Sequence, residues 1–451
     1  MQVTATLSEG LKREFRVVVP VTDLAARADA RLDDLRGRVN INGFRPGKVP
    51  VQHLKKLYGK SVLAETIEAL VGETNQKIVA DNGFKLAMEP SVKLPEAQDE
   101  AQAVFDGKAD LDYTVAFEVL PTITLADFKG IKVEKPVVEP SEADVQAMLE
   151  TMAKQNRPFE PKTKGKAEAG DRLTVAFVGT IDGETFDGGT AEDIQVEIGS
   201  NSFIPGFEDQ LVGVKTGDEK VIKVKFPSNY MAQQLAGKDA EFATTVKSIE
   251  KPGERKIDDE FAKMVGFEDL EKLKTAITDK LKDEYASASR RKVKRVLLDA
   301  LDEKHAFELP PTLVEQEFES VWRQVTQDLE SRGKTFADED STEEKAREDY
   351  RKIAERRVRL GLVLAEIGDK AQIKISDEEV TRAVVERARQ FPGQEQQVWD
   401  YYRKTPEALA SLRAPIFEEK VVDYILELAE VTEKVVSKDD LLKDNEDEEA
   451  A

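Results

Sequence analysis

The spacing of apolar positions changes along the chain, and the first 130 residues combine strand and helix patterns. An apolar run from Phe15 to Pro20 predicts a strand, and apolar positions at helical spacing predict helices over 21–36 and 51–82. Alternating apolar and polar residues return over 111–119, which is typical of a half-buried strand. This mixture predicts a compact α+β domain over residues 1–130.

A proline-punctuated connector follows over residues 131–169. Pro136 and Pro140 lie in this stretch and favour breaks in regular structure. Ser141 then precedes a helical pattern, with Asp144 three residues later, a combination that resembles the capping box at the start of helices. We therefore expect a linker that contains one connecting helix.

Residues 170–255 carry a β pattern. Short apolar runs are separated by Asp-Gly, Gly-Gly and Pro-Gly pairs, which favour tight turns between strands. A separate β-rich domain is therefore predicted, with strands at Leu173–Val178, Ile194–Ile198, Lys220–Phe226 and Glu241–Ile249.

Residues 256–433 have helical spacing almost throughout. Apolar stripes alternate with charged positions, and the pairs Pro310–Pro311 and Thr405–Pro406 are typical of helix starts. This pattern predicts an all-helical domain. The last 14 residues hold seven Asp or Glu against two Lys, so we expect residues 434–451 to form an acidic, disordered tail.

Composition excludes several kinds of chemistry. The 451 residues have a formal net charge of −22, no cysteine and two histidines, His53 and His305, neither with a metal-ligand pattern around it. Disulfides and thiol catalysis are excluded, and we expect no metal and no cofactor. No stretch approaches about 18 uninterrupted apolar residues, so we expect a cytoplasmic protein that does not span a membrane.

One loop combines backbone rigidity with positive charge. Two glycines and two prolines in residues 43–50 can form a tight, rigid loop that exposes an aromatic ring and two cations. From Arg31 to Lys60 the chain has eight Lys or Arg against two Asp, a local surplus of six positive charges. Such a patch suits a polyanion such as a nucleic-acid backbone. A solvated turn between two helices is the alternative interpretation.

A second candidate motif, Gly59, Lys60 and Ser61, matches the end of a phosphate-binding loop. Leu54, however, occupies the position of the first glycine of that loop, and a predicted helix precedes the motif where a strand is required. ATP use is therefore not expected.

The rigid loop resembles the ribosome-docking loop of the bacterial trigger factor family of nascent-chain chaperones. The resemblance implies that Phe44 is an apolar anchor and that Arg45 and Lys48 contact phosphate or acidic groups of ribosomal proteins. Pro46 stands where better-known members often have lysine. The ribosome-binding residues implied in this way are Gly43, Phe44, Arg45, Pro46, Gly47 and Lys48.

The β-rich domain resembles the FKBP-type peptidyl-prolyl isomerases. The motifs that carry the resemblance lie in residues 174–190, with Phe-Asp-Gly-Gly, and 196–211, with Ile-Pro-Gly-Phe. It implies a half-barrel around one helix, with a proline pocket formed by Phe177, Phe186, Asp187, Ile194, Phe203, Ile204, Phe207, Tyr230 and Phe242. Phe177 and Phe207 stand where small drug-binding members usually carry Tyr and Trp.

Prolyl isomerisation is slow because the amide C–N bond has double-bond character, which gives a barrier of about 20 kcal/mol. The twisted transition state loses this resonance and its carbonyl becomes less polar, so a dry aromatic pocket can favour it without any proton transfer. The core of a small barrel is the alternative interpretation of the same aromatic side chains.

The order of α+β domain, β-rich domain and helical domain resembles trigger factor over essentially the whole chain. The resemblance implies an ATP-independent, ribosome-associated chaperone with prolyl isomerase activity and a helical substrate cradle, active in protein folding, export and cell division. Its partners would be nascent unfolded polypeptides and the large ribosomal subunit near the exit tunnel, both protein and rRNA. A homodimer of the free protein stays open. Two alternatives are a free-standing FKBP-type isomerase and a holdase with a silent isomerase domain.

Overall fold

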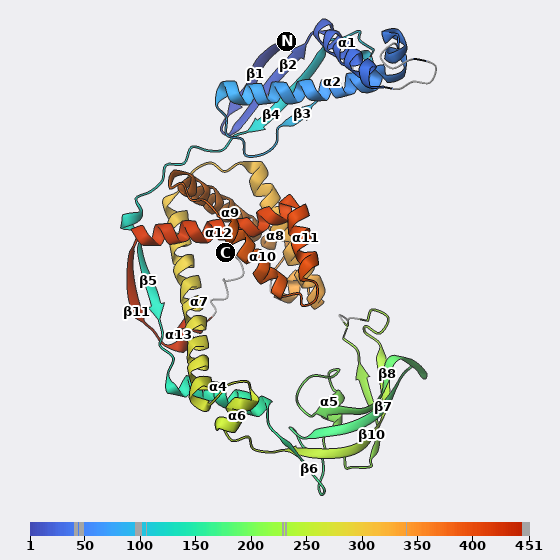
Figure 1. Ribbon diagram of the computed structural model, residues 1–451, viewed down its shortest axis with the longest axis vertical. Helices are drawn as coiled ribbons and strands as arrows, with labels where there is room; N and C mark the ends of the chain where they lie inside the picture. Colours follow the sequence, from blue (N-terminus) through green and yellow to red (C-terminus); the bar gives the residue numbers. More distant parts are fainter. Residues whose placement is uncertain are drawn as a thin grey trace.

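The computed structural model describes residues 1–39, 44, 49–94, 102–104, 106–227, 230, 232–339 and 341–443. Figure 1 shows an elongated molecule with the N-terminal domain at one end and the β-rich domain at the other. The helical domain lies between them, although it comes last in the sequence. The multidomain α+β architecture predicted from the sequence is confirmed.

The N-terminal domain is an antiparallel sheet with two helices packed on it. The strands lie in the order β1-β2-β4-β3, with β1 at Gln2–Glu9, β2 at Lys12–Val19, β3 at Ser91–Lys93 and β4 at Leu111–Glu118. Helices α1 (Val21–Arg38) and α2 (Val51–Asn82) share the core with the strands. Every residue of β1 is exposed, and the sequence analysis did not predict this strand although Val3, Ala5 and Leu7 alternate with polar residues. Gly59 lies inside α2, so a helix and not a strand leads directly into the suspected phosphate loop.

The β-rich domain contains all four strands predicted from the turn-separated runs. Its sheet has the order β6-β10-β7-β8, and β9 also pairs with β10. The strands are β6 (Phe159–Pro161), β7 (Arg172–Ile181), β8 (Glu184–Glu197), β9 (Glu219–Lys225) and β10 (Asp239–Pro252). The short helix α5 (Phe207–Leu211) contributes Phe207 and Leu211 to the same apolar core as the strands.

The helical domain begins with α6 and ends with α12. Pro311 starts α8 and Pro406 starts α12, as the sequence predicts, because proline at the first helical position loses no hydrogen bond. The helices are α6 (Asp259–Met264), α7 (Leu270–Lys304), α8 (Pro311–Arg332), α9 (Glu343–Lys370), α10 (Asp377–Arg389), α11 (Glu395–Lys404) and α12 (Pro406–Leu428), with 3-10 turns η1 (Phe128–Gly130) and η2 (Phe336–Glu339).

The first part of the connector packs with the helical domain, which the sequence analysis did not anticipate, whereas its last part contributes β6 to the sheet of the β-rich domain. Strand β5 (Lys132–Val137) pairs in parallel with β11 (Glu430–Val435), and Ile123 and Ile131 lie in the core of the helical domain. The N-terminal domain therefore ends before residue 123 rather than at 130. Helix α4 (Glu142–Gln155) begins with the expected capping box at Ser141 and packs on α7.

The prediction of a disordered tail from residue 434 is wrong for its first part. Residues 434 and 435 complete β11, and α13 (Lys438–Leu442) follows it. Leu441 is buried against the core formed by α4, α6 and α7. The apolar side chains of Val436, Leu441 and Leu442 and a parallel strand partner about 300 positions away hold this segment. Residues 444–451 lie outside the described residues.

Across the described ranges, no helix is both long enough and apolar enough to cross a membrane. In the same ranges, no group of three or more His, Asp or Glu side chains is placed to hold a metal ion.

Candidate functional site: an aromatic cavity in the β-rich domain

All nine side chains predicted for the proline pocket line one cavity of the β-rich domain. The cavity has a volume of about 570 Å³, and its lining comes from β7, β8, β10, α5 and the loops beside them. Seven further lining residues were not predicted: Gly188, Ser202, Pro205, Phe226, Pro227, Ala232 and Leu235. The structure thus brings together positions that lie as far apart in the sequence as 177 and 242.

Three buried rings, those of Phe177, Phe207 and Phe242, meet edge to face in the deep part of the lining. Their centroids are 5.8 Å apart for Phe177 and Phe207, 5.3 Å for Phe177 and Phe242, and 5.5 Å for Phe207 and Phe242. Each such pair contributes about 0.5–1.5 kcal/mol beyond the burial of its area. Phe203 stacks on Phe207 at 5.4 Å. The rings are therefore both part of the core of the β-rich domain and the wall of the cavity.

Phe226 is the most important of the residues that the sequence analysis missed. Its ring centroid lies 5.9 Å from that of Phe186 and 4.7 Å from that of Tyr230, so it joins two predicted members of the pocket. A signal was present, because Ile222, Val224 and Phe226 alternate and all three are buried. That alternation places Phe226 on the inner face of the sheet.

A glycine makes room for one of these rings. A Cβ built on Gly189 would lie 2.9 Å from the Cζ atom of Phe186. This position falls in the Phe-Asp-Gly-Gly segment of β8, where the pairing with β7 shifts register and Gly188 has a φ of 80° that other residues rarely adopt. The two glycines of the motif therefore have different roles: Gly188 permits the left-handed backbone, and Gly189 leaves space for the ring.

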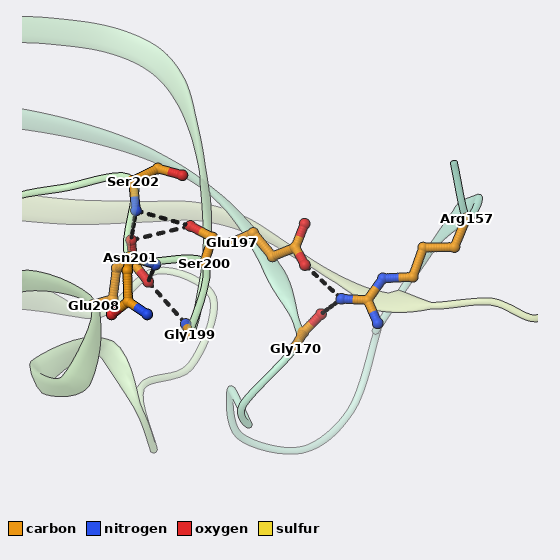
Figure 2. Close-up of polar contacts among 8 residues, drawn as sticks. All are labelled: Arg157, Gly170, Glu197, Gly199, Ser200, Asn201, Ser202 and Glu208. Carbon is orange, nitrogen blue, oxygen red and sulfur yellow. Dashed lines mark hydrogen bonds and ion pairs between the residues drawn. The ribbon is translucent and has the colours of Figure 1, made fainter. Parts of the chain in front are cut away.

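The loop between β8 and α5 is folded around one buried carboxylate, that of Glu208, as Figure 2 shows. Both carboxylate oxygens accept hydrogen bonds from this loop. The donors, at 2.8–3.2 Å, are the backbone N–H groups of Gly199, Asn201, Ser202 and Phe203 and the hydroxyl of Ser200. Burial by itself would raise the pKa of Glu208, yet these donors together hold the pKa below its ordinary value. The carboxylate is thus an ionised acceptor at neutral pH.

Asp187 lies exposed at the rim of the cavity. Among the described lining residues, only Asp187 and Tyr230 carry a side chain that can ionise. The cavity therefore holds no acid–base pair in its apolar interior. An apolar cavity of this kind can take a proline ring and favour the twisted amide over the planar one by its low polarity. The geometry supports rotation about an amide bond and offers no side-chain arrangement suited to hydrolysis.

The predicted docking loop is only partly within the described residues. Phe44 is described, whereas Gly43, Arg45, Pro46, Gly47 and Lys48 lie outside the described residues. The ring of Phe44 is 37% exposed and its centroid lies 5.3 Å from that of His53. Just after the loop, Val49 is buried in a small cluster with Leu32, Leu54 and Val62.

Several cations near this loop form ion pairs with carboxylates. Within 31–60, the described Lys and Arg side chains that do so are Arg31 with Glu65, Arg36 with Asp33, Arg38 with Asp34 and Lys55 with Asp29. The pairs are exposed, so each contributes little to stability. The effective positive charge of the patch is therefore smaller than a count of its lysines and arginines indicates.

A β-sheet with one short helix in its core and an aromatic cavity without an acid–base pair defines an isomerase domain of the FKBP class. A family model for FKBP-type peptidyl-prolyl cis-trans isomerase matches residues 163–247. Two further models flank it: bacterial trigger factor protein over residues 1–152, and the C-terminus of the same protein over residues 269–427.

Curated relatives match along their whole length. Trigger factors from a Bradyrhizobium species and from Azorhizobium caulinodans are each 59% identical, and that from Xanthobacter autotrophicus is 60% identical; in all three cases the match covers 100% of both chains. A solved structure from work on promiscuous substrate recognition by the trigger factor chaperone has a TM-score of 0.54, with 23% identity over 95% of this chain and 99% of that one. This likeness supports the fold.

The chain therefore belongs to the bacterial trigger factor family, chaperones that combine a ribosome-binding N-terminal domain with an FKBP-type peptidyl-prolyl isomerase domain. The family, the fold class and the enzyme class predicted from the sequence are confirmed.

Proposed function

We propose that the aromatic cavity is the isomerase active site and that its nine predicted residues bind the prolyl segment. The observation that carries this proposal is their convergence: side chains from six separate stretches of sequence line one apolar space of about 570 Å³. Phe177, Phe207 and Phe242 would contact the proline ring from below, while Asp187 and Tyr230 would contact the flanking peptide at the rim. The remaining walls are Phe186, Ile194, Phe203 and Ile204.

The rate enhancement would come from the difference in polarity between the planar and the twisted amide. A cavity that favours the twisted state by about 4 kcal/mol accelerates isomerisation about a thousandfold. Desolvation of the substrate carbonyl acts in the same direction, because the planar amide loses more hydration than the twisted one. The rate should therefore show no dependence on a general base.

A truncation in the wall tests the assignment. Phe186 is only half-buried, so Phe186→Ala removes a wall of the cavity while leaving the three deep rings in place. We expect kcat/KM for a prolyl tetrapeptide to fall at least tenfold. Val221→Ala is the control, because Val221 is an exposed apolar residue on β9 of the same domain. Equal activity of both variants and the parent would show that the cavity is not the active site.

We further propose that the loop around Phe44 docks on the large ribosomal subunit near the exit tunnel, with contacts to ribosomal protein and to rRNA. The exposed ring of Phe44 and the buried Val49 support this, since an anchor is effective when its loop is fixed at the base. Because several neighbouring cations are already paired, the apolar anchor should matter more than the charge count suggests.

Co-sedimentation with ribosomes tests the docking site. The double variant Phe44→Ala with Arg45→Ala should lose binding, and binding of the parent should weaken as salt rises. Val3→Ala with Arg13→Ala is the control, because it removes an exposed apolar side chain and an arginine from β1 and β2 of the same domain. Ribosome binding that persists in the Phe44 double variant would leave a chaperone that docks elsewhere; no binding by the parent would favour the free-standing isomerase.

The helical domain would hold nascent polypeptides in the cytoplasm. Helix α11 has no buried residue, and its Tyr401 is 56% exposed. Phe391, which precedes this helix, is 43% exposed. Exposed aromatic side chains of this kind suit weak binding of unfolded segments. Cross-linking of an unfolded client to positions 391 and 401 is the direct check.

We also propose that the free protein forms a homodimer, and sedimentation velocity in the absence of ribosomes would detect it.

A further inference from the structure

The buried carboxylate of Glu208 has no contact with the cavity, yet it organises the loop that forms one wall of it. Glu208 is 6% exposed and is absent from the lining, whereas Ser202, Phe203 and Ile204 in the loop line the cavity. The carboxylate is the common acceptor for donors from five consecutive residues, 199–203, of which Figure 2 shows the first four. The wall and its support are therefore different residues.

The conformation of this loop is one that the backbone would not hold without such support. Asn201 has a φ of 55°, in the left-handed region that residues other than glycine rarely adopt. Gly199 is also left-handed, with a φ of 90°. Successive N–H groups in such a turn point to the same side and form a concave nest for an anion. Here the anion is a side chain of the protein itself, and charge-assisted hydrogen bonds of this type are stronger than neutral ones.

The helix that carries Glu208 also carries a ring of the deep wall. Phe207 precedes Glu208 in α5, and Phe203 stacks on Phe207 at 5.4 Å with an angle of 18° between the ring planes. The N–H of Phe203 in turn donates to Glu208 at 3.2 Å. Two adjacent residues of one helical turn thus hold Phe203 from both ends, its backbone through the carboxylate and its ring through stacking.

We propose that Glu208 is a positioning residue of the prolyl isomerase, which fixes the loop 199–203 so that Phe203 and Ile204 form the wall of the cavity. The inference rests on the proposed assignment of the cavity as the active site. This positioning role requires a hydrogen-bond acceptor with two oxygens and no proton, which an ionised carboxylate supplies. An amide in the same place presents one oxygen and an NH₂ group that faces backbone N–H donors.

The test is Glu208→Gln in the full chain, assayed with a prolyl tetrapeptide by NMR exchange or a protease-coupled assay. We expect kcat/KM per folded molecule to fall about tenfold with an increase in KM, since the wall that contacts the peptide is no longer held. Amide resonances of Gly199, Asn201 and Ser202 should move upfield as their charge-assisted hydrogen bonds are lost. A residue that only stabilised the fold would change the folded fraction without changing the KM of the folded molecules.

Two further variants keep the proposal testable if Glu208→Gln folds poorly. Ser200→Ala removes a single donor to the carboxylate, and we expect a two- to threefold loss of kcat/KM. Asp218→Asn is the matched control, because its carboxylate accepts from the Lys215 N–H at 2.8 Å in a turn of the same domain away from the cavity, and we expect no change.

Comparison of Glu208→Gln with Phe186→Ala distinguishes failure of the positioning role from failure of the active-site assignment. If Phe186→Ala loses activity while folded Glu208→Gln keeps the KM of the parent, the positioning role is wrong and the active site stands. If neither variant changes kcat/KM, the cavity itself is not the active site, and the positioning role falls with it.

Discussion

Gly179 lies buried in β7, and its missing side chain leaves room for the ring of Phe242. A Cβ built on Gly179 would lie 2.6 Å from Cε1 and 2.9 Å from Cδ1 of that ring, and 3.0 Å from the carbonyl oxygen of Gly189. Real contacts of a Cβ are not this short. In Gly179→Ala the ring of Phe242 must therefore shift, because the backbone of β8 prevents movement of the new methyl group to the other side.

The magnitude follows from what the ring contacts. Phe242 packs edge to face on Phe177, Phe207 and Phe186, with centroids 5.3, 5.5 and 6.1 Å away. Overpacking of a well-filled core costs about 1–3 kcal/mol, and the gain from replacing glycine in a strand is below about 1 kcal/mol. We expect a net loss of about 1–2 kcal/mol in the free energy of unfolding of this domain. Since the displaced ring lines the cavity, kcat/KM should fall at least tenfold.

Hydrogen exchange of the amides of β10 is the suitable assay for stability. Both tryptophans, Trp322 and Trp399, lie in the helical domain, so their fluorescence would not follow unfolding of the β-rich domain. Gly72→Ala is the control, because a Cβ there meets nothing within 4 Å and Gly72 lies inside α2. It should stabilise its own domain by up to about 1 kcal/mol and leave isomerase activity unchanged. Unaltered exchange and activity in Gly179→Ala would refute the argument that the ring is held by close packing.

Two further predictions concern the helical domain and its connector. The hydroxyl and N–H of Ser141, followed by Lys438, hold the pKa of Asp144 at about 2, below its ordinary 3.8. A carboxyl group whose pKa is lower in the folded state stabilises the fold at pH values above its ordinary pKa. The contribution of Asp144 to the free energy of unfolding should therefore be lost as the pH falls from 3.8 toward 2. Acid-unfolding curves should show this loss in the parent and not in Asp144→Asn. His305 is buried, accepts the N–H of Ala126 at Nε2 at 3.1 Å and donates from Nδ1 to a carbonyl of α7. NMR of the ring nitrogens should therefore show the proton on Nδ1, and an Nε2-protonated ring would contradict this arrangement. His305→Phe should lower the free energy of unfolding by about 1–3 kcal/mol, because the N–H of Ala126 loses its acceptor.

Local patterns gave most of the secondary structure because they depend on neighbours in the sequence. The capping box at Ser141 and the proline starts of α8 and α12 were predicted and observed, since a helix end is decided within a few residues. The pocket residues came from motifs quoted as a resemblance. Glu208 stood inside one of those motifs and was not singled out, because a glutamate next to an aromatic residue gives no sign that it will be buried.

By itself, the sequence determined the three types of domain and the absence of cysteine chemistry. These follow from spacing, turn chemistry and composition, which act over short distances. Only the tertiary structure decided that β5 and β11 pair across about 300 residues, that Leu441 is buried and that the last domain in the sequence lies in the middle of the molecule. Half of the residues in each of these two strands are charged, and a pairing between distant segments depends on the geometry of everything that folds between them.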